Sequence, residues 1–178
     1  MNNLKPKTLF VDAIIWIFLM ILAAAVAFGL LRRDAQKSFG AISFGAFPEF
    51  RLQTTTGEFF DGHHLKGHVW AIHRGSNSKV FDVARRLASI EEKTAIGKRH
   101  LFILTFLDNP GLSFEPIVTS QYILLGTPQQ VQNIFSRGTT IDDEYVLLVD
   151  QNGIIRGSYD IDSSDSLRSF QQNLMLLL

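Results

Sequence analysis

Apolar and polar residues alternate along the chain in short runs, a pattern that is typical of alternating strands and helices. Strands are predicted by apolar runs at residues 68–72, 101–106, 122–125, 144–149 and 154–159. Apolar positions at helical spacing predict a helix over residues 79–93. Thr127 followed by Pro128 predicts the start of a second helix, because proline suits the first helical position. Residues 163–178 form a third amphipathic stretch that closes the chain.

Two turn signals complete this pattern. Residues 54–57 (Thr-Thr-Thr-Gly) separate two short apolar stretches, and residues 150–153 (Asp-Gln-Asn-Gly) separate the last two predicted strands. An Asn-Gly pair supplies the positive-φ positions of a hairpin turn. The predicted order is therefore hairpin, strand, helix, strand, strand, helix, hairpin, helix. Such an order favours an α/β sandwich, a central mixed sheet flanked by helices on both faces.

A different pattern precedes these elements. Residues 13–31 form a run of 19 residues without a charge, and as a helix this run would span about 28 Å, close to the ~30 Å of a bilayer's hydrocarbon core. A cleaved signal peptide is the alternative, since residues 25–27 (Ala-Val-Ala) resemble a cleavage site. The run exceeds the usual apolar region of about 7–15 residues, and Arg32 and Arg33 follow at once. We therefore predict a transmembrane helix at residues 13–31, with the lipid bilayer as its partner.

The anchor divides the chain into four predicted parts. Residues 1–12 form an N-terminal tail, residues 13–31 the transmembrane helix, residues 32–46 a tether rich in Gly, Ser and charge, and residues 47–178 the folded domain. Lys5 and Lys7 on one side of the helix nearly balance the three cations at positions 32, 33 and 37 on the other. Flanking charge therefore leaves the orientation of the helix undecided.

Composition narrows the chemistry of the domain. No cysteine occurs among the 178 residues, so disulfides, thiolate metal sites and redox-active dithiols are excluded. Lys and Arg number 17, as do Asp and Glu. Because a nucleic-acid partner requires a basic excess, this balance argues against one. No motif of a hydrolase or of a phosphate-binding loop is present, so the sequence predicts neither an enzyme nor a cofactor.

Four of the five histidines lie within eleven residues, at positions 63, 64, 68 and 73. Neutral imidazoles bind transition metals, but this spacing matches no established metal-binding signature. His68 and His73 would lie about 16 Å apart at opposite ends of a strand. His63 and His64 are then the only metal-ligand candidates, and we interpret them as solvated surface residues. A histidine-based metal carrier is the alternative function.

Phenylalanine is abundant, with 15 residues. Phe39, Phe44, Phe47 and Phe50 lie before the domain or at its start. A compact domain cannot bury all the phenylalanines of a tether, so we expect some of them to pack against membrane or partner.

Several motifs of the domain resemble those of a known family. These motifs are Phe47-Pro48-Glu49-Phe50-Arg51-Leu52, Thr56-Gly57-Glu58, Leu65-Lys66-Gly67-His68-Val69, Ile123-Leu124-Leu125-Gly126-Thr127 and Leu148-Val149-Asp150-Gln151-Asn152-Gly153. Together they resemble thioredoxin-like proteins, and among these the Sco/SenC copper chaperones of cytochrome c oxidase assembly. The resemblance covers most of residues 44–178. It implies a thioredoxin-like fold, an inner-membrane anchor, a periplasmic domain and a role in oxidase assembly.

The chain departs from this family at the metal ligands. An alignment without gaps, anchored on Gly67 and Gly75, places Lys79 and Val83 where the family has its Cys-x-x-x-Cys pair. The family's distal histidine falls at residues 142–144, which are Asp-Asp-Glu here. Copper(I) prefers sulfur ligands, and neither lysine nor valine replaces a thiolate. The resemblance therefore implies a relative without copper or redox chemistry.

We accordingly predict a membrane-anchored binding or assembly module, serving a respiratory oxidase or another membrane complex. The loop at residues 73–80, where the cysteines are missing, is the predicted partner-facing region. The predicted partner-facing residues are His73, Arg74, Ser76, Asn77, Lys79, Asp142 and Asp143.

Overall fold

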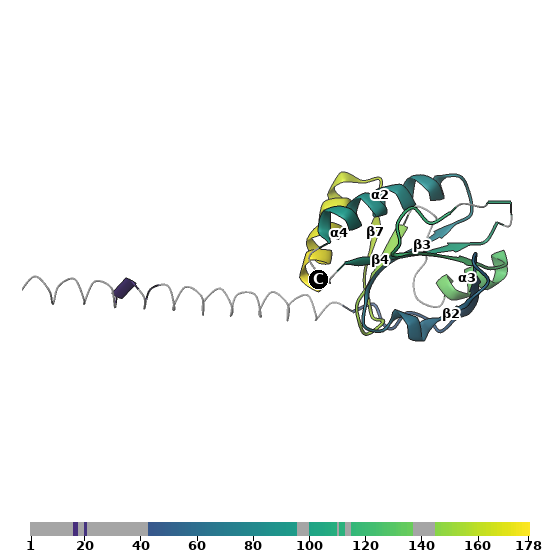
Figure 1. The fold of residues 1–178 in the computed structure, drawn as a ribbon, viewed down its shortest axis with the longest axis horizontal. Helices are drawn as coiled ribbons and strands as arrows, with labels where there is room; N and C mark the ends of the chain where they lie inside the picture. The colour runs from purple at the N-terminus through teal and green to yellow at the C-terminus, as the bar shows by residue number, and fades with distance from the viewer. Residues whose placement is uncertain are drawn as a thin grey trace, which may run out of the picture. The chain divides into compact units, whose positions relative to one another are not determined.

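A mixed sheet of seven strands, in the order β2-β1-β5-β4-β3-β6-β7, forms the centre of the domain (Figure 1). The strands are β1 (Arg51–Thr54), β2 (Phe59–Asp61), β3 (Val69–Gly75), β4 (Leu101–Leu107), β5 (Gln121–Leu125), β6 (Tyr145–Val149) and β7 (Ile155–Asp160). The three central strands β3, β4 and β5 are parallel, and antiparallel hairpins flank them on both sides. The carboxyl ends of β3, β4 and β5 therefore meet at one edge of the sheet, which we call the carboxyl edge.

The computed structural model describes residues 16–17, 20, 43–95, 100–109, 111–112, 115–136 and 145–178. The chain divides into two units, Met1–Ala41 and Ile42–Leu178, and the sheet belongs to the second. Within the described residues, no helix is both long and apolar enough to cross a bilayer. Most of the predicted transmembrane helix at residues 13–31 lies outside them, as do Asp142 and Asp143.

Helices cover both faces of the sheet. Figure 1 shows α2 (Lys79–Thr94) and α4 (Ser164–Leu177) on one face and α3 (Pro128–Ser136) on the other. One core cluster joins α2 and α4 to the sheet and includes Leu87 and Phe170. A second cluster, rich in aromatic rings, lies on the α3 face. The predicted α/β sandwich is confirmed, because apolar strands buried on both faces need a helical layer on each.

The predicted order of strands and helices is confirmed, with two local differences. β3 continues to Gly75, so that residues 73–75 belong to a strand and not to a loop. The apolar pattern does not predict this extension, because His73 and Arg74 are polar. The extension follows from the pairing of Gly75 with Leu107 in β4. The second difference is a 3₁₀ helix, η1 (Gly62–Leu65), which lies between β2 and β3 and contains both candidate metal ligands.

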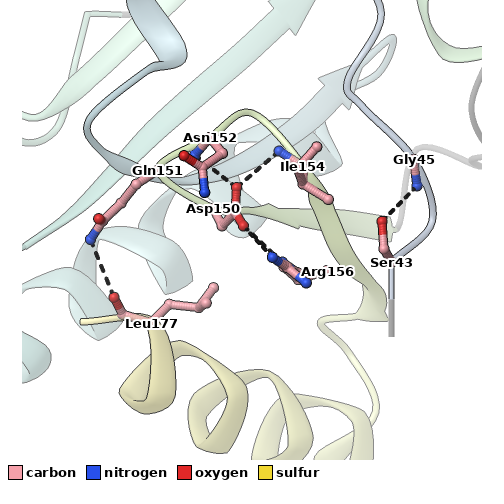
Figure 2. A network of polar contacts seen from close by, with 8 residues as sticks. All are labelled: Ser43, Gly45, Asp150, Gln151, Asn152, Ile154, Arg156 and Leu177. Carbon is pink, nitrogen blue, oxygen red and sulfur yellow. Dashed lines mark hydrogen bonds and ion pairs between the residues drawn. The ribbon is translucent and has the colours of Figure 1, made fainter. Parts of the chain in front are cut away.

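The β6–β7 turn corrects the prediction for its Asn-Gly pair. Gly153 has φ 78°, whereas no described non-glycine residue, Asn152 included, has positive φ. The loop is longer than a two-residue turn and closes by hydrogen bonds from Gly153 N to Asp150 O and from Asp150 N to Ile154 O, both 2.9 Å. Figure 2 shows the Asp150 carboxylate at its centre, accepting from the backbone of Asn152 and Ile154 at 2.8 and 3.0 Å. It also accepts from Arg156 Nε at 2.8 Å.

The segment before β1 is tied to this hairpin. Phe44 N donates to Ile155 O at 3.1 Å, and Phe47 N donates to Gly153 O at 2.8 Å. Phe47 and Phe50 are buried, whereas Phe44 is 54% exposed. Phe39 lies outside the described residues. The boundary at residue 47 stays a prediction, and residues 44–46 already hydrogen-bond or bridge to the domain.

Candidate functional site

An ion pair links the ends of β3 and β4 at the carboxyl edge. Arg74 Nε donates to Asp108 Oδ2 at 2.8 Å, and a second guanidinium nitrogen donates to the same oxygen. The Asp108 side chain is only 3% exposed, while that of Arg74 is 21% exposed. The parallel register pairs Arg74 with Phe106, so both charged side chains leave the sheet at the same end. Their pairing offsets the cost of burying a carboxylate.

The residues after β3 turn sharply into α2. A Cβ added to Gly75 would lie 2.7 Å from the Cβ of Val80, so only glycine lets the strand pass this close to the first helical turn. Asn77 Oδ1 accepts from Lys79 N at 2.8 Å and caps one of the exposed backbone donors. The helix begins at Lys79. The site is thus a tight strand-to-helix turn at the carboxyl edge.

This turn and the start of α2 contain Lys79 and Val83, the two positions that the sequence alignment without gaps predicts in place of the family's cysteines. Lys79 is exposed at the first position of α2, and Val83, one turn later, is buried in the core. A helix N-terminus carries a partial positive charge, which stabilises a thiolate and lowers the pKa of a cysteine there. Here the side chain at the N-terminus is itself a cation, and the second position offers no donor atom. The turn therefore presents charge and hydrogen-bonding groups, without a thiolate or another soft metal ligand.

An apolar groove lies at the same edge of the sheet. Its volume is about 520 Å³, and Leu107, Leu112, Leu125 and Pro128 supply its apolar lining. Asn109 and Thr127 contribute polar groups. Leu125 remains 44% exposed, which is high for a leucine beside a core strand. Together, the turn and the groove form a surface with an apolar centre and a polar margin.

The structure contradicts the predicted partner-facing role of His73. Its side chain is fully buried, so it is not available to face a partner. His73 lies inside β3, and its Nε2 is 2.8 Å from the Thr105 hydroxyl in β4. Gln121 in β5 donates to the same hydroxyl at 3.4 Å. Burial lowers the pKa of His73 to about 3, so that the imidazole is neutral at physiological pH.

The other predicted partner-facing residues differ in exposure. Asn77 and Lys79 are exposed, whereas Arg74 and Ser76 are half-buried. Asp142 and Asp143 are not among the described residues. Only part of the predicted set can therefore be assigned to one surface. Asp108 and the groove residues were not predicted, although Asp108 follows the apolar run of β4 directly and so had to lie at the carboxyl edge.

His63 and His64 lie in η1, which precedes the amino end of β3, whereas the carboxyl edge lies at the other end of that strand. His64 Nδ1 is 2.9 Å from Asp61 Oδ1, and its ring stacks on Phe60 with centroids 4.7 Å apart. Burial opposes a low pKa at Asp61, but hydrogen bonds from the His63 backbone and the His64 ring outweigh it, and the pKa is lowered. In the described part of the chain, no three His, Cys, Asp or Glu side chains are placed to hold a metal ion.

Comparison with solved structures identifies the fold as the thioredoxin-like fold of Sco/SenC proteins. A SCO1/SenC family lipoprotein from Bacillus anthracis superimposes with a TM-score of 0.60 at 17% identity, over 75% of this chain and 95% of that one. Yeast Sco1 with copper bound matches with a TM-score of 0.52 at 18% identity, over 72% and 92% of the two chains.

A third match is BsSco, described as a member of the Sco family of cytochrome c oxidase assembly proteins. Its TM-score is 0.55 at 14% identity, over 75% of this chain and 95% of that one. No known family profile matches the sequence, and no curated protein sequence does. These similarities establish the fold, and function has to be argued from the site.

Proposed function

We propose that the chain is a membrane-anchored, redox-inactive thioredoxin-like protein that acts as a binding module in the assembly of a respiratory oxidase. Residues 13–31 anchor it in the inner membrane, and the domain lies in the periplasm. The apolar run in the sequence supports the anchor. The similarity to BsSco, from a family of cytochrome c oxidase assembly proteins, supports the choice of partner.

A single observation carries this proposal. The chain has the fold of Sco proteins but contains no cysteine, and Lys79 and Val83 stand where the alignment without gaps predicts the family's cysteine pair. A fold kept without its reactive groups contributes shape and charge. We therefore assign recognition, and not electron or copper transfer, to the carboxyl edge.

The surface at this edge has the composition of a protein interface. Leu125 and Pro128 offer an apolar centre in the groove, and Asn77, Lys79 and Asn109 offer polar groups near it. Interfaces between proteins combine an apolar core with a polar rim in this way. The occupant we propose is an exposed segment of an oxidase subunit.

Site-specific photo-crosslinking in native membranes tests this assignment. A photoreactive amino acid replaces Lys79 or Leu125 in the full chain, and Gln171, exposed on α4, serves as the matched control. We expect adducts with an oxidase subunit from the first two positions and none from position 171. Identical adducts from all three positions, or adducts that contain no respiratory-complex subunit, would contradict the proposal. Stoichiometric copper in the purified wild-type protein would contradict its redox-inactive part.

A further inference from the structure

We infer that the end of the domain opposite the carboxyl edge rests on the bilayer surface, with Phe44 and Met175 inserted among the lipid headgroups. We call this end the amino pole and define it by residues 43–47, residues 66–68, the β6–β7 turn and the last turn of α4. The inference rests on the proposed membrane anchor and adds an orientation of the domain.

Hydrogen bonds gather these segments at one place. β6 is antiparallel to β3, with Val149 opposite Trp70, so that the β6–β7 turn lies at the amino end of β3. Gly67 N donates to Gln151 O at 2.8 Å. Gln151 Nε2 reaches Leu177 O at the end of α4 at 3.5 Å. Figure 2 shows this contact in the same view as Ser43 and Gly45.

The chain enters the domain at this pole. Phe44 N donates to the backbone of Ile155, and only eleven residues, 32–42, separate the apolar run from Ser43. Eleven residues span at most about 40 Å when fully extended. The tether therefore keeps the amino pole within reach of the headgroups, whereas the carboxyl edge lies a further seven-residue strand away, about 23 Å.

The chemistry of the pole suits the bilayer interface. Phe44 is 54% exposed and Met175 is 48% exposed, while the neighbouring Phe47 and Phe50 are buried in the core. Lys66 supplies an exposed cation there, and His68 is exposed beside it. Apolar side chains beside a cation are the composition by which protein surfaces bind at lipid headgroups. These features predict that Phe44, which is not buried in the core, contacts lipid.

A cavity of about 360 Å³ is lined at this pole by Ala46, Lys66, Asn152 and Gly153, and it extends to Arg51 and Asp61 at the carboxyl-edge ends of β1 and β2. Glu49 and His63 also line it. Groups of both signs can pair with the phosphate and the ammonium of a zwitterionic headgroup. A dry, apolar protein interface would leave such charges without water or partners.

The absence of native cysteine makes the test direct, because a single introduced cysteine is the only thiol to label. The full chain carries Phe44→Cys, Met175→Cys or, as the control at the opposite edge, Lys79→Cys. Each variant is labelled with an environment-sensitive fluorophore in vesicles of phosphatidylethanolamine and phosphatidylglycerol. Lipids spin-labelled at the headgroup serve as quenchers.

We expect severalfold stronger quenching at positions 44 and 175 than at position 79. Equal or weaker quenching at the amino pole would overturn the inference. Extraction of the same membranes at alkaline pH tests the membrane anchor separately from the orientation of the domain. Retention of the chain together with unquenched labels at 44 and 175 overturns the orientation and leaves the anchor standing, whereas release of the chain overturns the anchor and the orientation with it.

Discussion

Arg74 and Asp108 join the carboxyl ends of two adjacent parallel strands, although 34 positions separate them in the sequence. Asp108 is the more buried partner, with 3% of its side chain exposed. Its carboxylate lies where β4 leaves the sheet, between the strand-to-helix turn and the groove. The ion pair therefore fixes the two halves of the candidate site relative to each other.

Removing this carboxylate should destabilise the domain. We expect Asp108→Asn to lower the free energy of unfolding by about 2–3 kcal/mol, because it removes the charge of a buried carboxylate that pairs with Arg74. Asp82→Asn is the control, since its 3.4 Å contact with Arg85 is exposed on both sides and should contribute less than about 1 kcal/mol. Urea unfolding of the full chain in detergent micelles, followed by Trp70 fluorescence in a Trp16→Phe background, measures both. Equal losses would contradict a structural role for the pair.

His73 should make the domain sensitive to acid. Its pKa falls from the usual 6.5 to about 3 on folding, because burial disfavours the charged ring. The unfolded chain therefore binds more protons between these values. The contribution of His73 is intact above pH 6.5 and is lost as pH falls, by at most about 1.4 kcal/mol per pH unit.

The effect of His73 on pH dependence is separable from that of the carboxylates. We expect His73→Leu to flatten the stability profile between pH 6 and pH 4 relative to wild type, whatever its stability at neutral pH. His63→Gln, which changes an exposed imidazole, is the control and should flatten the profile less than His73→Leu. Urea midpoints measured across this range decide the question, and parallel profiles for wild type and His73→Leu would refute it.

Local patterns predict the elements of this fold, and long-range register accounts for what they miss. Continuous apolar runs identify the central strands because these strands are buried on both faces. The end of β3 is different, because His73 and Arg74 are polar and resemble a loop until pairing with Thr105 and Phe106 is known. The Arg74–Asp108 pair and the His73–Thr105 contact both depend on that parallel register. A single sequence does not state which strands are neighbours.

Gly75 sets the shape of the strand-to-helix turn. We expect Gly75→Ala to cost about 1–3 kcal/mol, since the new methyl group would overlap Val80 and push the start of α2 away from the sheet. Gly62→Ala should cost under about 0.5 kcal/mol, because no atom lies within 4 Å of the added carbon. Crosslinking from position 79 should also fall in the Gly75→Ala variant. Similar unfolding midpoints for the two variants would show that α2 adjusts without cost.

The N-terminus of α2 should still activate a thiol if one is supplied. We expect Lys79→Cys to have a thiol pKa about one unit below the ordinary 8.5, because the helix dipole and the backbone N–H groups stabilise the thiolate. Gln171→Cys, exposed in the interior of α4, should titrate near the ordinary value. Rates of alkylation by iodoacetamide between pH 6 and pH 10 give both pKa values, since each variant contains a single cysteine. A depressed pKa at position 79 alone means that the fold retains the electrostatic environment of a reactive cysteine and lacks only the sulfur. Indistinguishable titrations would mean that the environment was lost along with the residue.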